Sequence, residues 1–222
     1  MVCSTSALGI VVIELVRGSP TRLRDLVLEL SSGQGLSSDI ELEDKMTDLR
    51  YPIGKFHFDG PLDDQEKTKY LEDVARTPAH LRAAVQGLSP QQLDTPYRPE
   101  GWTVRQVVHH VPDSHLNAYL RFKLALTEEE PTIKPYAEDR WARLADTAST
   151  PIETSLTLLD SLHDRWVRLL RSLKPDDWKR AFRHPELGLV SLEKNLALYA
   201  WHGRHHVAHI TSLRERNGWD RS

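Results

Sequence analysis

The sequence predicts an all-α protein built as a four-helix bundle, and three observations lead to this prediction. Four long stretches carry apolar residues at the spacing of one helix face. No segment shows a sustained alternation of apolar and polar residues with β-branched side chains, so little or no β-sheet is expected. Segments that contain proline or glycine separate the four stretches, as is typical of the connections between helices.

The first two predicted helices cover residues 63–86 and 103–126. The first ends at Gly87, and its apolar stripe consists of Leu71, Val74, Leu81 and Val85. The second follows a turn at residues 99–102 and takes Thr103 as its N-cap. Pro112 lies inside it, where a proline frees the carbonyl of Val108 and is expected to kink the helix beside His110.

The last two predicted helices cover residues 151–173 and 192–216. Lys174-Pro175 ends the third helix, Ser191 caps the fourth, and Asn217-Gly218 ends it. Residues 127–150 are longer than an ordinary bundle connection, so we expect a long crossover between helices two and three, with a short helix around residues 139–145. Residues 182–190 are expected to be a plain connection between helices three and four.

Residues 1–45 differ in composition from the rest of the chain. They hold the only cysteine, Cys3, together with a Ser/Gly-rich stretch, and they contain no aromatic residue. A dense sequence with aromatic residues begins at Met46. We therefore expect two parts: a poorly ordered N-terminal extension over residues 1–45, consistent with an upstream translation start, and a helical domain over residues 46–222.

Composition excludes several classes of protein. The chain has 29 Lys and Arg against 32 Asp and Glu, a net charge of −3, so it lacks the basic excess of proteins that neutralise nucleic-acid phosphates. One cysteine allows neither an intrachain disulfide nor a cysteine-based zinc site, which favours a cytoplasmic location. The longest apolar run, residues 7–13, is far shorter than the roughly 20 residues of a membrane helix, so no membrane partner is expected.

Four of the eleven histidines crowd into the fourth predicted helix. His202 and His206 are one turn apart beside the apolar stripe, which is the spacing of paired imidazole ligands on zinc-binding helices. His205 and His209 form a second pair with the same spacing; His205 lies farther round the helix, and His209 is a candidate partner of a ligand. Ordinary core or surface histidines are the alternative. No Glu follows His202, which excludes the metalloprotease motif.

A catalytic metal site with an open position needs a third protein ligand, and the second predicted helix offers His110 and His115. His115 lies along the apolar stripe. His110 lies on a different face, which carries no Lys or Glu. The other residues of this face are Gln106, Asp113, Ser114, Asn117 and Arg121. Helix periodicity does not decide between the two histidines. Asp113 is a candidate general base or ligand-orienting group, and Asn117 and Arg121 are candidates for gripping an anionic substrate.

Several runs of sequence after residue 50 carry a resemblance to a known family. They are residues 51–56 (YPIGKF), 101–110 (GWTVRQVVHH), 113–115 (DSH), 121–128 (RFKLALTE), 131–136 (PTIKPY) and 201–210 (WHGRHHVAHI). With them, the chain from residue 51 to about residue 214 resembles the DinB superfamily and, within it, the YfiT-like metal-dependent hydrolases. Residues 1–45 lie outside this family's pattern.

The resemblance implies an up-down-down-up bundle that binds one divalent metal ion per subunit, zinc or nickel, through three histidines. These correspond to His110, His202 and His206 in this chain, so the resemblance selects His110 over His115. It also implies a homodimer.

Together, these observations predict a cytoplasmic metal-dependent hydrolase that activates water for attack on a small-molecule substrate. The resemblance also implies a second enzyme class, a metal-dependent S-transferase that uses a low-molecular-weight thiol such as bacillithiol. Because the domain has no cysteine, such a thiol must come from outside the protein. The alternative of another class is a non-catalytic metal- or ligand-binding bundle that acts in a stress response.

Overall fold

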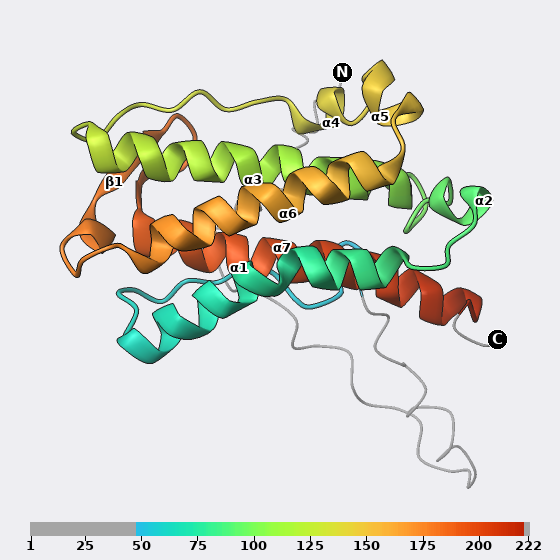
Figure 1. Cartoon of the computed structure of the whole chain (residues 1–222), viewed down its shortest axis with the longest axis horizontal. Coiled ribbons are helices and arrows are strands. Elements are labelled where there is room, and N and C mark those ends of the chain that lie inside the picture. The colour runs from blue at the N-terminus through green and yellow to red at the C-terminus, as the bar shows by residue number, and fades with distance from the viewer. Residues whose placement is uncertain (1–47, 220–222) are drawn as a thin grey trace, which may run out of the picture.

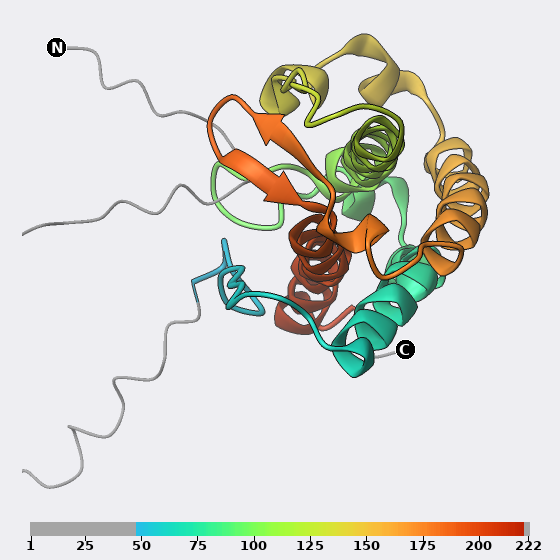
Figure 2. The same cartoon turned by 90° about the vertical axis from the view of Figure 1, so that its left-hand side faces the viewer.

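The computed structural model describes residues 48–219, and the predicted extension over residues 1–45 lies outside these described residues. Four long helices form the bundle: α1 (Asp64–Val85), α3 (Val104–Thr127), α6 (Ile152–Arg171) and α7 (Leu192–Asn217). Helices α1 and α7 run in one direction and α3 and α6 in the other, which is the up-down-down-up topology (Figure 1). Seen from one end, the four helices surround a common interior (Figure 2).

Side-chain caps determine where the helices begin. Asp63 caps α1 and Thr103 caps α3, and each side-chain oxygen accepts a hydrogen bond from the backbone N–H three positions later. The side-chain oxygens of Glu66 and Gln106 in turn accept a hydrogen bond from the backbone N–H of the capping residue, which completes a capping box at each helix. The cap at Thr103 therefore places His110 about two turns inside α3, where its side chain faces the interior.

The core contains two apolar clusters with polar side chains between them. One cluster gathers around Trp166 and the other around Ile210, and neither residue is exposed to solvent. Along α3 and α7, His115, His202 and His206 lie between the segments that contribute to the two clusters. Burial of apolar side chains on both sides of these histidines holds the two helices in register.

The connection from α3 to α6 is the long crossover that the sequence predicts. It contains α4 (Glu138–Trp141) and α5 (Ala145–Ser149), and it passes along α3 (Figure 1). The short helix expected around residues 139–145 is found as α4, but it ends earlier than expected, and Leu144, with extended backbone angles (φ −69°, ψ 157°), separates it from α5. A further short helix, α2 (Pro90–Leu93), precedes α3.

A β-hairpin lies between α6 and α7, where a plain connection was expected. After the 3₁₀ helix η1 (Asp177–Lys179), strands β1 (Ala181–His184) and β2 (Gly188–Ser191) pair in antiparallel fashion. Four residues per strand are too few for a two-residue period to stand out in the sequence. Gly188 has a φ of +70°, which glycine adopts without steric cost at the turn. The small sheet remains within the prediction of little sheet, but the hairpin itself was missed.

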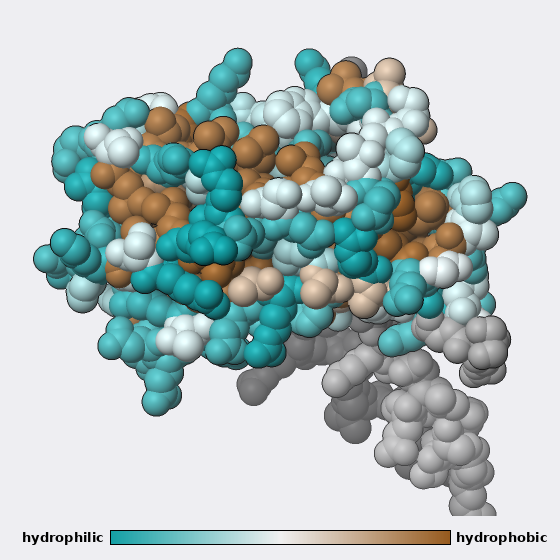
Figure 3. All heavy atoms as spheres, in the orientation of Figure 1, coloured by the Kyte–Doolittle hydropathy of each residue, from teal (hydrophilic) through white to brown (hydrophobic). Residues whose placement is uncertain are grey.

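The surface of the bundle is mixed. Figure 3 shows apolar residues among polar ones on the face formed by α3 and α6. The exposed large apolar side chains include Leu116 and Leu120 on α3 and Leu158 on α6. Across residues 48–219, no helix combines the length and the apolar character that crossing a bilayer requires.

Candidate metal centre

Three imidazoles meet in the interior of the bundle. His110 comes from α3, and His202 and His206 come from adjacent turns of α7. One ring nitrogen from each lies within 4.8 Å of the others, and all three residues are at least nine-tenths buried. The structure therefore brings together the three histidines that the family resemblance singled out, two of which the i, i+4 spacing also favoured.

The packing of α3 against α7 sets the geometry of this cluster. The Nε2 atoms of His110 and His202 are 3.3 Å apart, so both point toward the same space. The ring centroids of His202 and His206 are 4.4 Å apart, as expected for residues one turn apart on a helix. Three imidazoles from two packed helices make a donor set typical of zinc and of other divalent transition metals.

Burial keeps the three rings uncharged. It lowers the pKa of His110 to about 3, and the neighbouring His209 adds to the shift. Burial also lowers the pKa values of His202 and His206 well below the ordinary value for histidine. A neutral imidazole has one nitrogen lone pair, which is what a metal ligand needs. Nδ1 of His206 is buried and makes no hydrogen bond within residues 48–219, so this ring has unused capacity to bind a ligand.

The crossover covers the cluster and adds an acidic group to it. Glu138 is 7% exposed, and its Oε2 atom is 4.0 Å from Nε2 of His110. Trp102 packs on His110 with ring centroids 4.6 Å apart, and its Nε1–H donates a hydrogen bond to Asp139. Gln106 donates a further bond from Nε2 to the carbonyl of Ala142, at 2.9 Å. These contacts hold the crossover in place against the histidine cluster.

Three hydroxyl groups lie on the side of the cluster formed by α3, the crossover and α7. Oγ of Ser114 is 3.4 Å from Nε2 of His202 and 3.5 Å from the hydroxyl of Tyr199. The hydroxyl oxygen of Tyr136 is buried on the same side, near the hydroxyl of Ser114. Burial, followed by the nearby Tyr199, raises the pKa of Tyr136, so its hydroxyl keeps its proton. The site thus combines neutral nitrogen donors, one carboxyl group and proton-bearing hydroxyls.

Glu138 and Tyr136 were not predicted from the sequence as site residues. Both come from the crossover, and their approach to the cluster depends on how that segment folds back along α3. Tyr136 ends one of the runs that resemble the family, and this was the only signal that could have drawn attention to it.

The other candidate histidines occupy separate surroundings. His115 is fully buried and contacts His163 of α6 and His202 rather than joining the three clustered nitrogens. His205 stacks on Trp201 with ring centroids 4.3 Å apart and, unlike its predicted position farther round the helix, is buried. His209 stacks on Tyr97 at 3.9 Å, and its Nε2 is 3.2 Å from the carbonyl oxygen of Arg50.

The polar candidates on α3 take other positions. Asp113 is half-buried, and burial, with Asp146 as a second cause, raises its pKa to about 6. The amide nitrogen of Asn117 donates to the backbone oxygen of Asp113 at 2.9 Å. The guanidinium of Arg121 is buried 6.0 Å from the centroid of the Phe182 ring. Within residues 48–219, none of these three side chains hydrogen-bonds to the clustered imidazoles.

Comparison with known proteins places the chain in a family. A family model described as the DinB superfamily matches residues 73–210. A protein of Bacillus mycoides (strain KBAB4) named "Putative metal-dependent hydrolase" is 56% identical over 174 residues, which cover 78% of this chain and 100% of that protein. A protein of Bacillus cereus (strain B4264) with the same name is 55% identical over the same length and coverage.

A solved structure is also similar. It is YfiT from Bacillus subtilis, described as "a probable metal-dependent hydrolase with an unusual four-helix bundle topology". It shares 49% sequence identity and superposes with a TM-score of 0.75, over 77% of this chain and 98% of that one. The similarity therefore extends over the whole bundle rather than over the histidine motif alone.

Proposed function

Since this chain belongs to the DinB superfamily, we propose that it is a metal-dependent hydrolase in which His110, His202 and His206 hold one divalent ion, zinc or nickel. The observation that carries the proposal is the convergence of three buried ring nitrogens within 4.8 Å. Such an ion, when bound with an open position, supplies Lewis acidity that makes water a stronger nucleophile at neutral pH.

The residues around the proposed ligands have roles that follow from their positions. Glu138 places Oε2 beside the cluster in a buried setting, where it can accept a proton from the attacking water. Tyr136 keeps its proton, and its buried hydroxyl lies near Ser114, where it can donate a hydrogen bond to a small-molecule substrate. Trp102 lies over His110 and limits the access of bulk water.

The thiol S-transferase is the second candidate, and it rests on the family resemblance. The single cysteine is Cys3, so no cysteine occurs anywhere in residues 48–219. A three-histidine metal site lowers the pKa of a bound thiol as well as that of water. In this alternative, a free low-molecular-weight thiol such as bacillithiol would supply the nucleophile.

The metal ligands can be tested by substitution with a matched control on the same helix. We expect His110→Ala, His202→Ala and His206→Ala each to lose the stoichiometric zinc or nickel that the wild-type protein binds. His205→Ala is the control, because His205 is buried on α7 beside the cluster but is not one of the three converging residues. Metal content is measured by mass spectrometry of the purified proteins. Stoichiometric metal in all three ligand variants would contradict the proposed site.

The reaction class can be tested on the metal-loaded protein with a panel of esters, amides and electrophiles, each with and without bacillithiol. Turnover without thiol supports hydrolysis, and turnover only with thiol replaces it by the S-transferase. Absence of turnover in both conditions, despite bound metal, favours a non-catalytic binding bundle.

Where the wild-type protein hydrolyses a substrate, Glu138→Gln should lower the turnover with little change in metal content. The substitution removes the proton acceptor and preserves the size of the side chain.

The proposal includes a cytoplasmic location, which rests on the single cysteine, and a homodimer, which rests on the family resemblance. Sedimentation of the full chain tests the second point, and a monomer at micromolar concentration would contradict it. Fractionation of the source cells tests the first point.

A further inference from the structure

A row of three buried imidazoles leads from the proposed metal ligand His202 across the core to α1. Nδ1 of His202 is 3.1 Å from Nε2 of His115, and Nδ1 of His115 is 2.8 Å from Nε2 of His163. Nδ1 of His163 is 2.7 Å from the backbone oxygen of Val74 on α1. All three distances are hydrogen-bond distances, and the three histidines are at least nine-tenths buried. The row therefore links α7, α3, α6 and α1.

The backbone of α1 provides the end point of this row. Pro78 lies inside α1, four residues after Val74, and a proline has no N–H group. The carbonyl of Val74 therefore lacks the donor that normally completes its helical hydrogen bond. A buried carbonyl without a partner is costly, and the N–H of His163 replaces the missing donor.

The carbonyl also determines the direction of every hydrogen bond in the row. An oxygen of this kind only accepts, so the proton of the His163 ring must be on Nδ1. In a neutral ring, Nε2 of His163 then has the lone pair and accepts a hydrogen bond from Nδ1–H of His115. By the same argument, Nε2 of His115 accepts from Nδ1–H of His202. Nε2 of His202 is left with its lone pair, and this is the atom that points toward His110.

We propose that His115 and His163 are positioning residues that hold His202 in the neutral tautomer with its proton on Nδ1, whose Nε2 can bind a metal ion. The inference deepens the proposed function and rests on His202 as a metal ligand. The inference also gives His115 a role, because His115 orients the metal-binding residue His202 from the opposite side of the core.

The opposite direction of these hydrogen bonds conflicts with the structure. If Nε2 of His202 carried the proton, Nδ1 of His163 would present a lone pair to the carbonyl oxygen of Val74 at 2.7 Å. Two buried acceptors at that distance repel each other. The hydroxyl of Ser114, 3.4 Å from Nε2 of His202, can donate to this nitrogen and so is compatible with the proposed direction.

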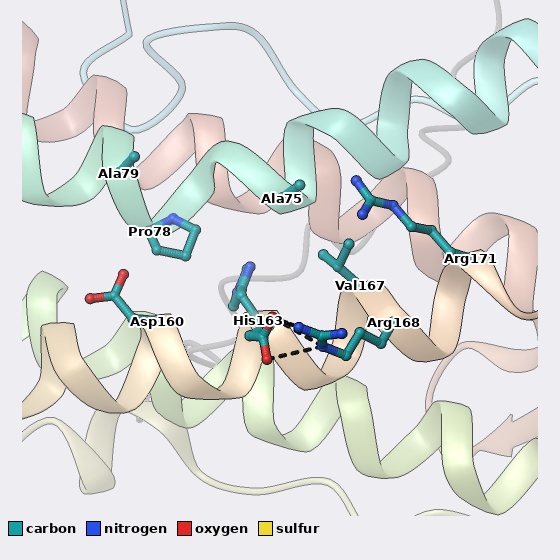
Figure 4. Close-up of a pocket in the computed structure, with 9 residues that line it drawn as sticks. Ala75, Pro78, Ala79, Asp160, His163, Val167, Arg168 and Arg171 are labelled. Atoms are coloured by element: carbon teal, nitrogen blue, oxygen red, sulfur yellow. Dashed lines mark hydrogen bonds and ion pairs between the residues drawn. The ribbon is translucent and has the colours of Figure 1, made fainter.

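His163 is a suitable position for substitution because it lies beside a surface groove. Figure 4 shows His163 on α6, with Ala75 and Pro78 of α1 across from it. The groove continues past Val167, and Arg168 at its edge is paired with Asp164. A side chain of different shape at position 163 can adjust toward this groove, so a substitution there is expected to preserve the fold.

The first experiment observes the ring protons directly in the metal-free, full-length protein. Long-range ¹⁵N–¹H NMR spectra distinguish the two neutral forms of each histidine, and single variants assign the signals. We expect the proton on Nδ1 in His163, His115 and His202. In His163→Leu, the acceptor for His115 is lost, so a form of His202 with the proton on Nε2 should appear. A wild-type His202 with its proton on Nε2 would overturn the inference.

The second experiment measures zinc affinity by competition with a chelator. We expect the Kd of His163→Leu to rise about 10- to 100-fold, the range typical when a hydrogen-bond partner of a metal-binding histidine is lost. His163→Gln should recover most of the affinity, because its amide can donate to Val74 and accept from His115. His184→Leu is the control for loss of a buried histidine, since His184 lies in β1 and outside the row.

The outcomes separate the two proposals. Equal zinc affinity in His163→Leu and His184→Leu, with an unchanged form of His202, would overturn the positioning role while zinc binding by the wild type still supports the metal site. If the wild-type protein binds no zinc or nickel but His202 has its proton on Nδ1, the metal site fails and the hydrogen-bond direction stands.

Discussion

At the scale of single residues, the role of each buried histidine depends on the neighbours that its two ring nitrogens meet. His202 has His115 on one nitrogen and the proposed metal position on the other, whereas His163 ends on a backbone carbonyl. His209 instead stacks on Tyr97 and contacts a backbone oxygen of the segment before α1. One residue type thus serves as candidate ligand, positioning group and packing group within a single core.

Asp113 provides a prediction about pH at this scale. Burial raises its pKa in the folded protein from 3.8 to about 6, so the folded state holds the proton more tightly than the unfolded state does. The contribution of the protonated Asp113 to the free energy of unfolding is fully present below pH 3.8 and is lost as the pH rises through 6. Asp113→Asn should therefore raise the free energy of unfolding by about 1–2 kcal/mol at pH 7.5, after allowance for partial exposure, and by much less at pH 4.

Urea denaturation at the two pH values measures this difference. Asp146→Asn is the companion variant, because Asp146 is the second cause of the raised pKa. It should lower the pKa of Asp113, observed by NMR titration, without reaching the ordinary value. A stability gain of the same size at pH 4 and pH 7.5 would show that ionisation of Asp113 is not its cause.

The residues of the candidate site differ in how far the sequence could predict them. His202 and His206 could be predicted because their spacing alone puts them on one helix face. The choice between His110 and His115 could not be made from periodicity, since both face the interior and differ only in the partner across the core. Glu138 could not be predicted at all, because its position depends on the folding of the crossover.

At the scale of elements, α1 and α7 approach closely at Gly203. A Cβ atom at this position would lie 2.5 Å from Oγ1 and 2.8 Å from Cγ2 of Thr77. Thr77 is 2% exposed, and its hydroxyl donates to the backbone oxygen of Asp73, so it has little freedom to move away. The absence of a side chain at Gly203 therefore sets the distance between the two helices beside His202.

Gly203→Ala should lower the free energy of unfolding by about 1–3 kcal/mol, as extra atoms in a packed core do. The overlap with Thr77 outweighs the gain of up to about 1 kcal/mol that alanine offers in a helix. Urea denaturation measures the change. Adding Thr77→Ala removes the two atoms that overlap, so the double variant should recover part of the loss. If Gly203→Ala costs the same with and without Thr77, the close contact is not the reason.

The long helices could be predicted closely, because their caps and apolar stripes are local features of the sequence. The bounds of α1, α3, α6 and α7 lie within a residue or two of the expected ranges. The hairpin of β1 and β2 was missed because part of its support is distant: the backbone N–H of Ile133, in the crossover, donates to the carbonyl oxygen of Arg183. No local pattern records such a contact.

At the scale of the whole molecule, the proposed site connects parts of the bundle that are distant in sequence. His110 and His202 are 92 positions apart, and they meet between the two apolar clusters of the core. A ligand that binds only when both helices are in place stabilises the folded state alone.

Metal binding should therefore raise the melting temperature of the protein. At a free zinc concentration about 100 times the Kd, the expected stabilisation is about 2.7 kcal/mol. For a chain of this size, that corresponds to a rise of roughly 5–10 °C. Differential scanning calorimetry with zinc, and again after chelation, measures the shift. The His202→Ala variant should show no rise, and an equal rise in that variant would place the metal elsewhere.

The position of α7 at the end of the bundle has a consequence for how the protein is made. A ribosome adds about 5–20 residues per second, so the segment with His110 and Glu138 emerges several seconds before His202 and His206. Until then, the growing chain presents only one of the three proposed ligands. In the cell, the metal should therefore be acquired after synthesis of α7, and a chain terminated before residue 192 should compete for none of the cell's zinc or nickel at this site.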